Sequence, residues 1–230
     1  MDFLWEVLVD AVRSLATVGP QLWTVVALTL VVSVMSTLIG VVLGVPLGAT
    51  LALGRFRGKG LLRLAVSVGM GFPPVLAGLL LLLVFWRSGP LGGLGLIFTP
   101  TAMVIAQVVL ATPIAAGVTA GSIRGLGAAA REQLAALPLG RVGRAVVAVR
   151  EARAGVAAAV AACFGRVVAE VGAVLVVGGN IVGETRVLTT LIVEESRQAR
   201  FGAAVAAGLI LLAISMVVNV AVDRLGGRGA

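Results

Sequence analysis

The sequence predicts an all-α integral membrane protein with five membrane-spanning helices. Of its 230 residues, 60% are hydrophobic and 12% are charged, and the mean hydropathy is +1.13. A soluble domain of this length needs far more polar surface to cover its core. Long apolar runs also recur along the chain, and each can supply the roughly 20 residues that one helix needs to cross a bilayer. They cover residues 21–54, 64–86, 98–123, 154–177 and 202–222.

The N-terminal segment, residues 1–20, predicts an amphipathic helix at the membrane surface. Its apolar residues recur at helical spacing and its charged residues fall elsewhere, which is typical of an interfacial helix. Because the segment begins with acidic residues, a cleaved signal peptide fits less well. The apolar stripe consists of Phe3, Leu4, Val7, Leu8, Ala11, Val12 and Leu15, and the charges are Asp2, Glu6, Asp10 and Arg13.

The first three spans carry prolines and glycines that predict irregularities. The first run is longer than one crossing needs, so we expect it to tilt, protrude or kink near Pro46. Helical breaks are expected at Pro73 and Pro74 in the second span and at Pro113 in the third. Backbone freed by proline is tolerated at membrane depth only beside protein or water, so these prolines are candidate gating positions. Ordinary kinks are the alternative. Gly40, Gly44 and Gly48 predict a close helix-packing seam on the first span.

The distribution of cations predicts the orientation of the chain. The segments 55–63 and 124–153 and the C-terminal tail are basic, and five spans place all three on one side of the membrane. The positive-inside rule then puts the N-terminus outside and the C-terminus in the cytoplasm. The cations concerned are Arg55, Arg57, Lys59, Arg63, Arg124, Arg131, Arg141, Arg144, Arg150, Arg153, Arg224 and Arg228.

The cytoplasmic segment 124–153 is too polar to span. It predicts a short helix over residues 128–137, which Pro138 and Gly140 end, followed by a basic helix that leads into the fourth span. A helix held out from the membrane in this way can enter a groove on a cytoplasmic partner. An amphipathic helix resting on the bilayer surface is an equally good interpretation.

The fourth span contains the residues that cost most to place at membrane depth. Arg166 and Glu170 are four residues apart, so on a continuous helix they share one face and can pair. An ionisable residue inside the membrane indicates a functional site by default, and a structural ion pair is the alternative. Small residues beside them predict a second packing seam, made of Ala158, Ala162, Gly165, Ala169 and Gly172.

Several functions are excluded. The chain has no histidine and one cysteine, Cys163, which excludes a histidine-based catalytic triad, a histidine-ligated metal and an internal disulfide. The glycine-rich stretch 54–60 has three rather than four residues between its glycines, so it is no nucleotide-binding loop. The net charge of +8 does not form one basic face, so we expect no nucleic-acid partner. No catalytic, cofactor-binding or metal-binding residue is expected, and transport driven by a partner's energy source fits best.

Six segments of the chain carry a resemblance to a known family. They are Gly71–Val75, Arg87–Gly92, Phe98–Gln107, Ala169–Ala173, Gly178–Ile181 and Arg186–Thr190. With five spans and an EAA-type cytoplasmic loop between the third and fourth, the chain resembles the permease subunits of bacterial ABC importers. It is more specifically similar to the tungstate-specific permeases over residues 20–225, and the related molybdate permeases carry a variant of two of these segments.

The resemblance implies a permease domain over residues 21–225 in the bacterial cytoplasmic membrane. It implies a homodimer, two cytoplasmic ATP-binding subunits that carry the ATP, and an extracytoplasmic tungstate- or oxyanion-binding protein; the chain itself would hold no cofactor. Pro138 stands where the family usually has a glycine. The coupling residues implied by the resemblance are Glu132, Gln133, Leu134, Ala135, Ala136 and Leu137.

The expected function is import of an oxyanion, most specifically tungstate, by alternating access. Arg166, with Arg186 at the outer mouth, would lower the barrier for a doubly charged anion, and Glu170 would hold Arg166. Selectivity is expected chiefly at the binding protein. The alternatives are a permease for molybdate or another oxyanion, an ATP-independent anion channel or secondary carrier, and a membrane anchor without a transport role.

Overall fold

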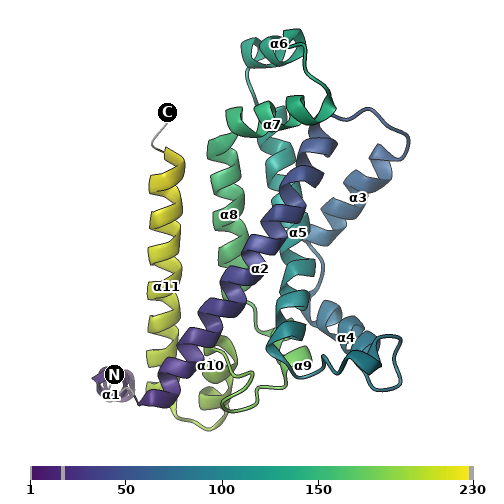
Figure 1. The fold of residues 1–230 in the computed structure, drawn as a ribbon. Helices are drawn as coiled ribbons and strands as arrows, with labels where there is room; N and C mark the ends of the chain where they lie inside the picture. The colour runs from purple at the N-terminus through teal and green to yellow at the C-terminus, as the bar shows by residue number, and fades with distance from the viewer. Residues whose placement is uncertain (1, 17–18, 228–230) are drawn as a thin grey trace. The chain divides into compact units, whose positions relative to one another are not determined.

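The computed structural model describes residues 2–16 and 19–227, without the side chains of residues 2, 15, 16, 20, 131, 135, 223 and 225–227. Three predictions therefore lie outside the described residues. They concern Leu15 in the apolar stripe, Ala135 in the cytoplasmic helix and Arg228 in the tail. Within these ranges the chain is helical and contains no strand (Figure 1). The elements are α1 (Asp2–Ala16), α2 (Pro20–Leu53), α3 (Lys59–Met70), α4 (Pro74–Phe85), the short 3-10 helix η1 (Gly92–Leu94), α5 (Pro100–Arg124), α6 (Ala128–Ala136), α7 (Arg141–Glu151), α8 (Arg153–Val168), α9 (Gly172–Gly178), α10 (Leu188–Arg197) and α11 (Phe201–Gly227).

Three of the five predicted spans are continuous helices among the described residues, and the other two are pairs of helices with a bend between them. The helices α2, α5 and α11 are each long and apolar enough to cross a bilayer. The pairs α3 with α4 and α8 with α9 pass the same test when each pair counts as one span with a break. The expected kink near Pro46 does not interrupt α2, which continues through that residue to Leu53.

The predicted breaks at proline are right for one site and wrong for the other. α3 ends at Met70 and α4 begins at Pro74, with Pro73 in an extended conformation before it. Proline suits the first turn of a helix, where its missing N–H would have no partner. The prediction for Pro113 is wrong, because this residue lies inside an unbroken α5.

Two contacts let α5 continue through Pro113. The hydroxyl of Thr112 donates a hydrogen bond of 2.8 Å to the carbonyl of Val108, which adds a bond in the turn that loses one to the proline. Gly69 makes room for the proline ring, since a Cβ atom there would lie 2.8 Å from Cβ of Pro113.

The chain divides into two compact units, each built from three separate stretches. Unit 1 comprises Met1–Met35, Pro73–Gln107 and Val167–Val217, and unit 2 comprises Ser36–Phe72, Val108–Arg166 and Val218–Ala230. In unit 1, Val25 and Val26 of α2 pack with Leu188 of α10 and Ala207 of α11. The buried Thr29 hydroxyl accepts a hydrogen bond of 2.9 Å from the backbone N–H of Leu188, which ties the start of α10 to α2.

The glycine seam predicted on the first span is confirmed in unit 2, where it faces α5. A Cβ atom at Gly48 would lie 2.5 Å from the carbonyl oxygen of Ala116. One at Gly40 would lie 2.7 Å from Cβ of Ala111, and Gly44 is equally crowded. A side chain at any of these positions would force the two backbones apart.

The second predicted seam holds at one end only. A Cβ atom at Gly172 would lie 2.5 Å from Cγ2 of Val75 on α4, so this glycine does allow close packing. Ala158, Ala162 and Ala169 are exposed, and a Cβ atom at Gly165 would meet no described atom within 4 Å. The exposed part of the stripe is therefore not a packing seam between helices of this chain.

Candidate functional site

The loop that follows α9 in unit 1 is fixed by a buried threonine. α9 ends in two left-handed residues, Gly179 with φ 72° and Asn180 with φ 52°. The Thr185 hydroxyl donates a hydrogen bond of 2.5 Å to the carbonyl of Gly178 and accepts one of 2.9 Å from the backbone N–H of Ile181. Because this side chain is fully buried and uses both hydrogen-bonding functions, it holds the loop in one conformation.

The same loop positions Arg186. Its Nε donates a hydrogen bond of 3.1 Å to Oδ1 of Asn180, and its backbone N–H donates 3.0 Å to the carbonyl of Ile181. The side chain is half-buried, and no carboxylate of the described residues pairs with it. An arginine held through Nε keeps the N–H donors of its terminal nitrogens, the groups that bind a tetrahedral oxyanion.

Phe98 braces the loop from the start of α5. It has φ 59°, a left-handed conformation that is strained for a bulky residue. The N–H of Phe98 donates a hydrogen bond of 2.9 Å to the carbonyl of Val177, and a Cβ atom at Gly179 would lie 2.8 Å from the Phe98 ring. The next residue, Thr99, accepts a hydrogen bond of 3.3 Å from the N–H of Ala102 and so caps α5. Phe98 therefore adopts its strained conformation where the start of α5 contacts the end of α9.

The inference that Arg166 and Glu170 share one helical face is wrong. Arg166 lies in the last turn of α8, which ends at Val168, and its side chain is exposed. Glu170 lies in the break before α9, so the spacing of four does not place the two residues on one helix. The glycine at position 172, where α9 begins, favours this break over a continuous turn.

Glu170 instead organises the break from within unit 1. It is 8% exposed, and its Oε1 accepts a hydrogen bond of 3.2 Å from the N–H of Ala173 in the first turn of α9. The backbone carbonyl of Glu170 accepts a hydrogen bond of 3.0 Å from the hydroxyl of Thr189 on α10. Gly78 of α4 packs against Ala173, where an added Cβ atom would lie 2.9 Å away from Cα. The break thus joins α4, α9 and α10.

The predicted cytoplasmic helix is present in unit 2 as α6, one residue shorter than expected. Leu134 is 4% exposed and packs with Ala49, Ile123, Ala148 and Ala152. The side chains of Glu132, Gln133, Ala136 and Leu137 are exposed. One buried apolar side chain therefore anchors α6, and the exposed side chains of Glu132, Gln133, Ala136 and Leu137 can contact a partner.

Pro138 ends α6 in the expected way. Leu137 is extended, with φ −66° and ψ 130°, as a residue before proline prefers, and its N–H still donates 3.2 Å to the carbonyl of Gln133. The basic helix α7 then begins at Arg141 and is followed directly by α8, which confirms the predicted order.

Asn180, Thr185 and the conformation of Phe98 were not predicted as parts of the site. The glycine pair before Asn180 was the available signal, because two glycines followed by asparagine are typical of a left-handed turn. Nothing in the spacing of Thr185 indicates that its hydroxyl fastens that turn.

Comparison with known proteins identifies relatives along nearly the whole chain. The family model described as "Binding-protein-dependent transport system inner membrane component" matches residues 40–228. A probable anion ABC transporter permease protein of Haloferax volcanii is 39% identical over 85% of this chain and 87% of its own length. The tungstate uptake system permease protein TupB of Peptoclostridium acidaminophilum is 35% identical over 98% of this chain and 99% of its own.

A solved structure shares the fold. A bacterial ABC transporter involved in the import of the acidic polysaccharide alginate superposes with a TM-score of 0.74, at 17% identity over 96% of this chain and 84% of that one. At this identity the likeness concerns the fold alone.

Proposed function

Because this chain belongs to the family of inner membrane components of binding-protein-dependent transport systems, we propose that it carries tungstate across the cytoplasmic membrane. The chain is the permease subunit of an ABC importer. The observation that supports tungstate is the near full-length similarity to a tungstate uptake permease. Molybdate or another oxyanion is the alternative cargo, since tetrahedral oxyanions present the same charge and acceptor geometry to arginine.

Arg186 is the proposed receiving group for the oxyanion. Its Nε is held by Asn180 at 3.1 Å, so the remaining donors are presented in a fixed direction. Preorganised donors stabilise a doubly charged anion because they need no rearrangement when it arrives. Arg166, exposed in the last turn of α8, is the second cation of the proposed path. Glu170 shapes the α8–α9 break through Ala173 rather than contacting the cargo.

The helix α6 would couple ATP hydrolysis in the partner subunits to transport. We place its exposed side chains, Glu132, Gln133, Ala136 and Leu137, in a groove of each of two cytoplasmic ATP-binding subunits. ATP is bound there, and this chain holds no cofactor. Tilting of α6 would rock the fourth and fifth spans, with Pro73 and Pro74 at the break of the second span as the gating position.

The remaining parts of the assembly follow the same reasoning. A second copy of the chain completes the transport path, and an extracytoplasmic oxyanion-binding protein delivers the cargo. The basic segments 55–63 and 124–153 lie in the cytoplasm with the C-terminus, and the N-terminus lies outside.

Glu132→Lys tests the coupling. It inverts the charge of an exposed α6 side chain, so both retention of the ATP-binding subunits and oxyanion uptake into vesicles should be lost. Glu184→Lys makes the same change at an exposed residue outside the coupling loop and should leave retention unchanged. Normal retention and uptake in Glu132→Lys would contradict the coupling role. Uptake without any partner ATPase would favour the channel or carrier.

Arg166→Ala tests whether Arg166 lies on the proposed translocation path of the oxyanion. Uptake should fall by more than assembly does, because the lost cation faces the cargo rather than the core. Arg57→Ala, which removes an exposed loop cation, is the control. Equal loss of uptake and assembly in Arg166→Ala would indicate a structural role for this arginine.

A further inference from the structure

A groove lies between α1 and the first turn of α11, both in unit 1. Ala11 is buried in this contact, and a Cβ atom at Gly202 would lie 2.6 Å from Cβ of Asp10. The rings of Phe3 and Phe201 meet edge to face, with centroids 5.9 Å apart and an interplanar angle of 79°. The helix α1 is therefore packed onto α11, and the groove between them is part of the fold.

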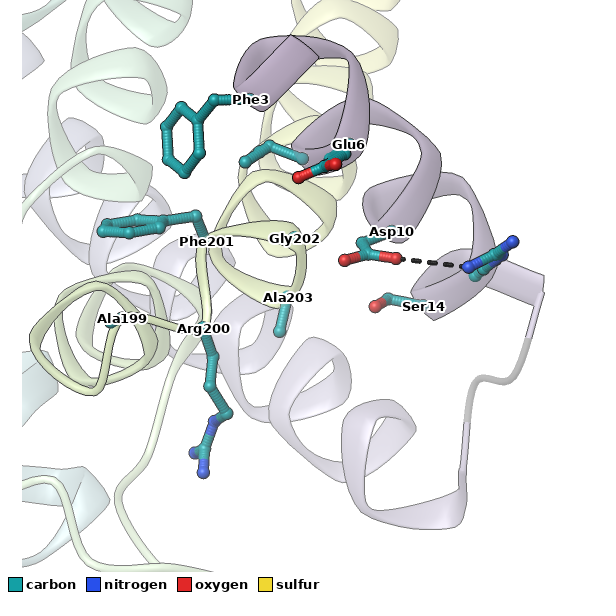
Figure 2. Close-up of a pocket in the computed structure, with 11 residues that line it drawn as sticks. Phe3, Glu6, Asp10, Ser14, Ala199, Arg200, Phe201, Gly202 and Ala203 are labelled. Carbon is teal, nitrogen blue, oxygen red and sulfur yellow. Dashed lines mark ion pairs between the residues drawn. The ribbon is translucent and has the colours of Figure 1, made fainter.

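The groove has a volume of about 460 Å³ and a mixed lining. Glu6, Asp10 and Ser14 line it from α1, and the aromatic pair Phe3 and Phe201 lines it at one end (Figure 2). Carboxylates attract an ammonium group by charge-assisted hydrogen bonds, and aromatic faces attract it through their quadrupoles. The lining therefore fits an organic ammonium group.

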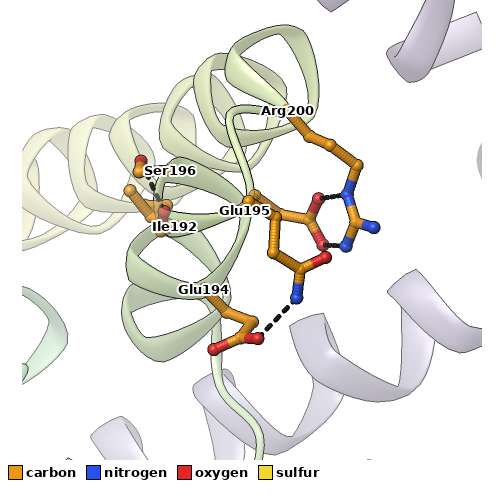
Figure 3. A network of polar contacts seen from close by, with 6 residues as sticks. Ile192, Glu194, Glu195, Ser196 and Arg200 are labelled. Atoms are coloured by element: carbon orange, nitrogen blue, oxygen red, sulfur yellow. Dashed lines mark hydrogen bonds and ion pairs between the residues drawn. The ribbon is translucent and has the colours of Figure 1, made fainter.

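The arginines of the groove do not cancel this preference. Arg200 extends away from the α1 carboxylates in Figure 2 and is bound by Glu195, whose Oε1 accepts a hydrogen bond of 2.8 Å from Nη2 and whose Oε2 accepts one from Nε (Figure 3). These hydrogen bonds raise the pKa of Arg200, so it stays charged and committed to Glu195. Nη1 of Arg13 lies 3.5 Å from Oδ1 of Asp10, but both side chains are more than half exposed, so this ion pair is weak.

The outer face of α1 indicates where the ammonium group comes from. Leu4 is 67% exposed and Trp5 is 69% exposed, and Leu8 and Val12 continue the same exposed apolar face. In a chain that spans a bilayer, such a face lies in the headgroup and upper acyl region, where tryptophan is enriched. The groove beside it then opens among lipid headgroups.

We propose that this groove binds the ammonium group of a phosphatidylethanolamine headgroup and thereby fixes α1 to the membrane surface. The carboxylates of Glu6 and Asp10 accept hydrogen bonds from the primary ammonium, and the rings of Phe3 and Phe201 contact its methylene groups. Phosphatidylglycerol lacks the ammonium and adds only negative charge, so the same carboxylates repel it.

Lipid retention tests the proposal on the full chain. The chain is reconstituted in nanodiscs of equal parts phosphatidylethanolamine and phosphatidylglycerol, re-extracted in mild detergent, and its bound lipids are measured by native mass spectrometry. The wild type should retain phosphatidylethanolamine in preference. Glu6→Gln with Asp10→Asn should lower that preference roughly three- to tenfold, given two exposed charge contacts. Glu151→Gln, at an exposed acid of α7, should leave it unchanged.

A second variant tests the groove without changing its charge. Ala203→Phe fills the groove from α11 and should lower the same preference. Equal retention of the two lipids by the wild type, or an unchanged preference in the charge-neutral and filled variants, would overturn the proposal. So would loss of the oxyanion-binding protein from the neutral variant with normal lipid retention, because the groove would then serve that protein. None of these readouts depends on cargo uptake, so the proposal can fail while the transport function stands.

Discussion

The role of Leu134 as the anchor of α6 leads to a quantitative prediction. α6 spans only Ala128–Ala136, and a helix this short is not stable alone in water. Leu134 is its one described side chain that is buried, at 4% exposure, among residues of α2, α5 and α7. Leu134→Ala removes most of that contact and should cost about 2–3 kcal/mol of α6 docking. The population with α6 undocked should then rise roughly 30- to 140-fold.

Hydrogen exchange of the α6 amides in the purified chain measures this directly, with no partner present. Exchange in α6 of Leu134→Ala should speed up by the same factor, while exchange in α5 stays slow. Leu137→Ala is the matched control, because Leu137 is 38% exposed and gains less from docking. Unchanged exchange in Leu134→Ala, or equal acceleration in both variants, would refute the assignment of Leu134 as the anchor.

Three further substitutions have expected effects on thermal unfolding in detergent. Thr119 is fully buried and its hydroxyl has no hydrogen-bond partner in the described structure, so Thr119→Val should stabilise the chain by about 1 kcal/mol. The control Thr112→Val removes the hydrogen bond to Val108 and should not stabilise the chain; equal effects of the two substitutions would contradict this prediction. Ala199 has φ 56°, so Ala199→Gly should stabilise by about 1 kcal/mol, whereas Ala213→Gly inside α11 should destabilise by a similar amount. Gly48→Leu should destabilise by at least about 1 kcal/mol because the added side chain meets the α5 backbone, and an unchanged midpoint would contradict the seam.

The spans and the cytoplasmic helix could be predicted because they depend on local composition. A bilayer requires apolar runs of fixed length, and Pro138 and Gly140 both disfavour continuation of the short helix α6. The continuation of α5 through Pro113 could not be predicted in this way, because the packing of the proline ring against Gly69 is a tertiary contact. The presence of a proline was visible in the sequence, and its surroundings were not.

The geometry of the candidate site depended on tertiary contacts. Periodicity placed Arg166 and Glu170 on one helix, but α8 ends at Val168, and the Glu170 side chain accepts a hydrogen bond from the N–H of Ala173 in α9. Arg186 could be singled out as a cation near a span end. Its fixing by Asn180 depends on a left-handed turn that only the folded loop reveals.

Coupling to an ATP-binding subunit requires that α6 face the cytoplasm. Residue 133 is the position for a reporter cysteine, because Gln133 is exposed whereas Leu134 is buried. Cys163 is buried, and replacing it with alanine leaves the reporter as the only thiol. In Gln133→Cys, a membrane-impermeant maleimide should modify the reporter only after the membrane is opened. Modification from outside intact cells would contradict the orientation, the coupling role of α6 and the transport function built on them.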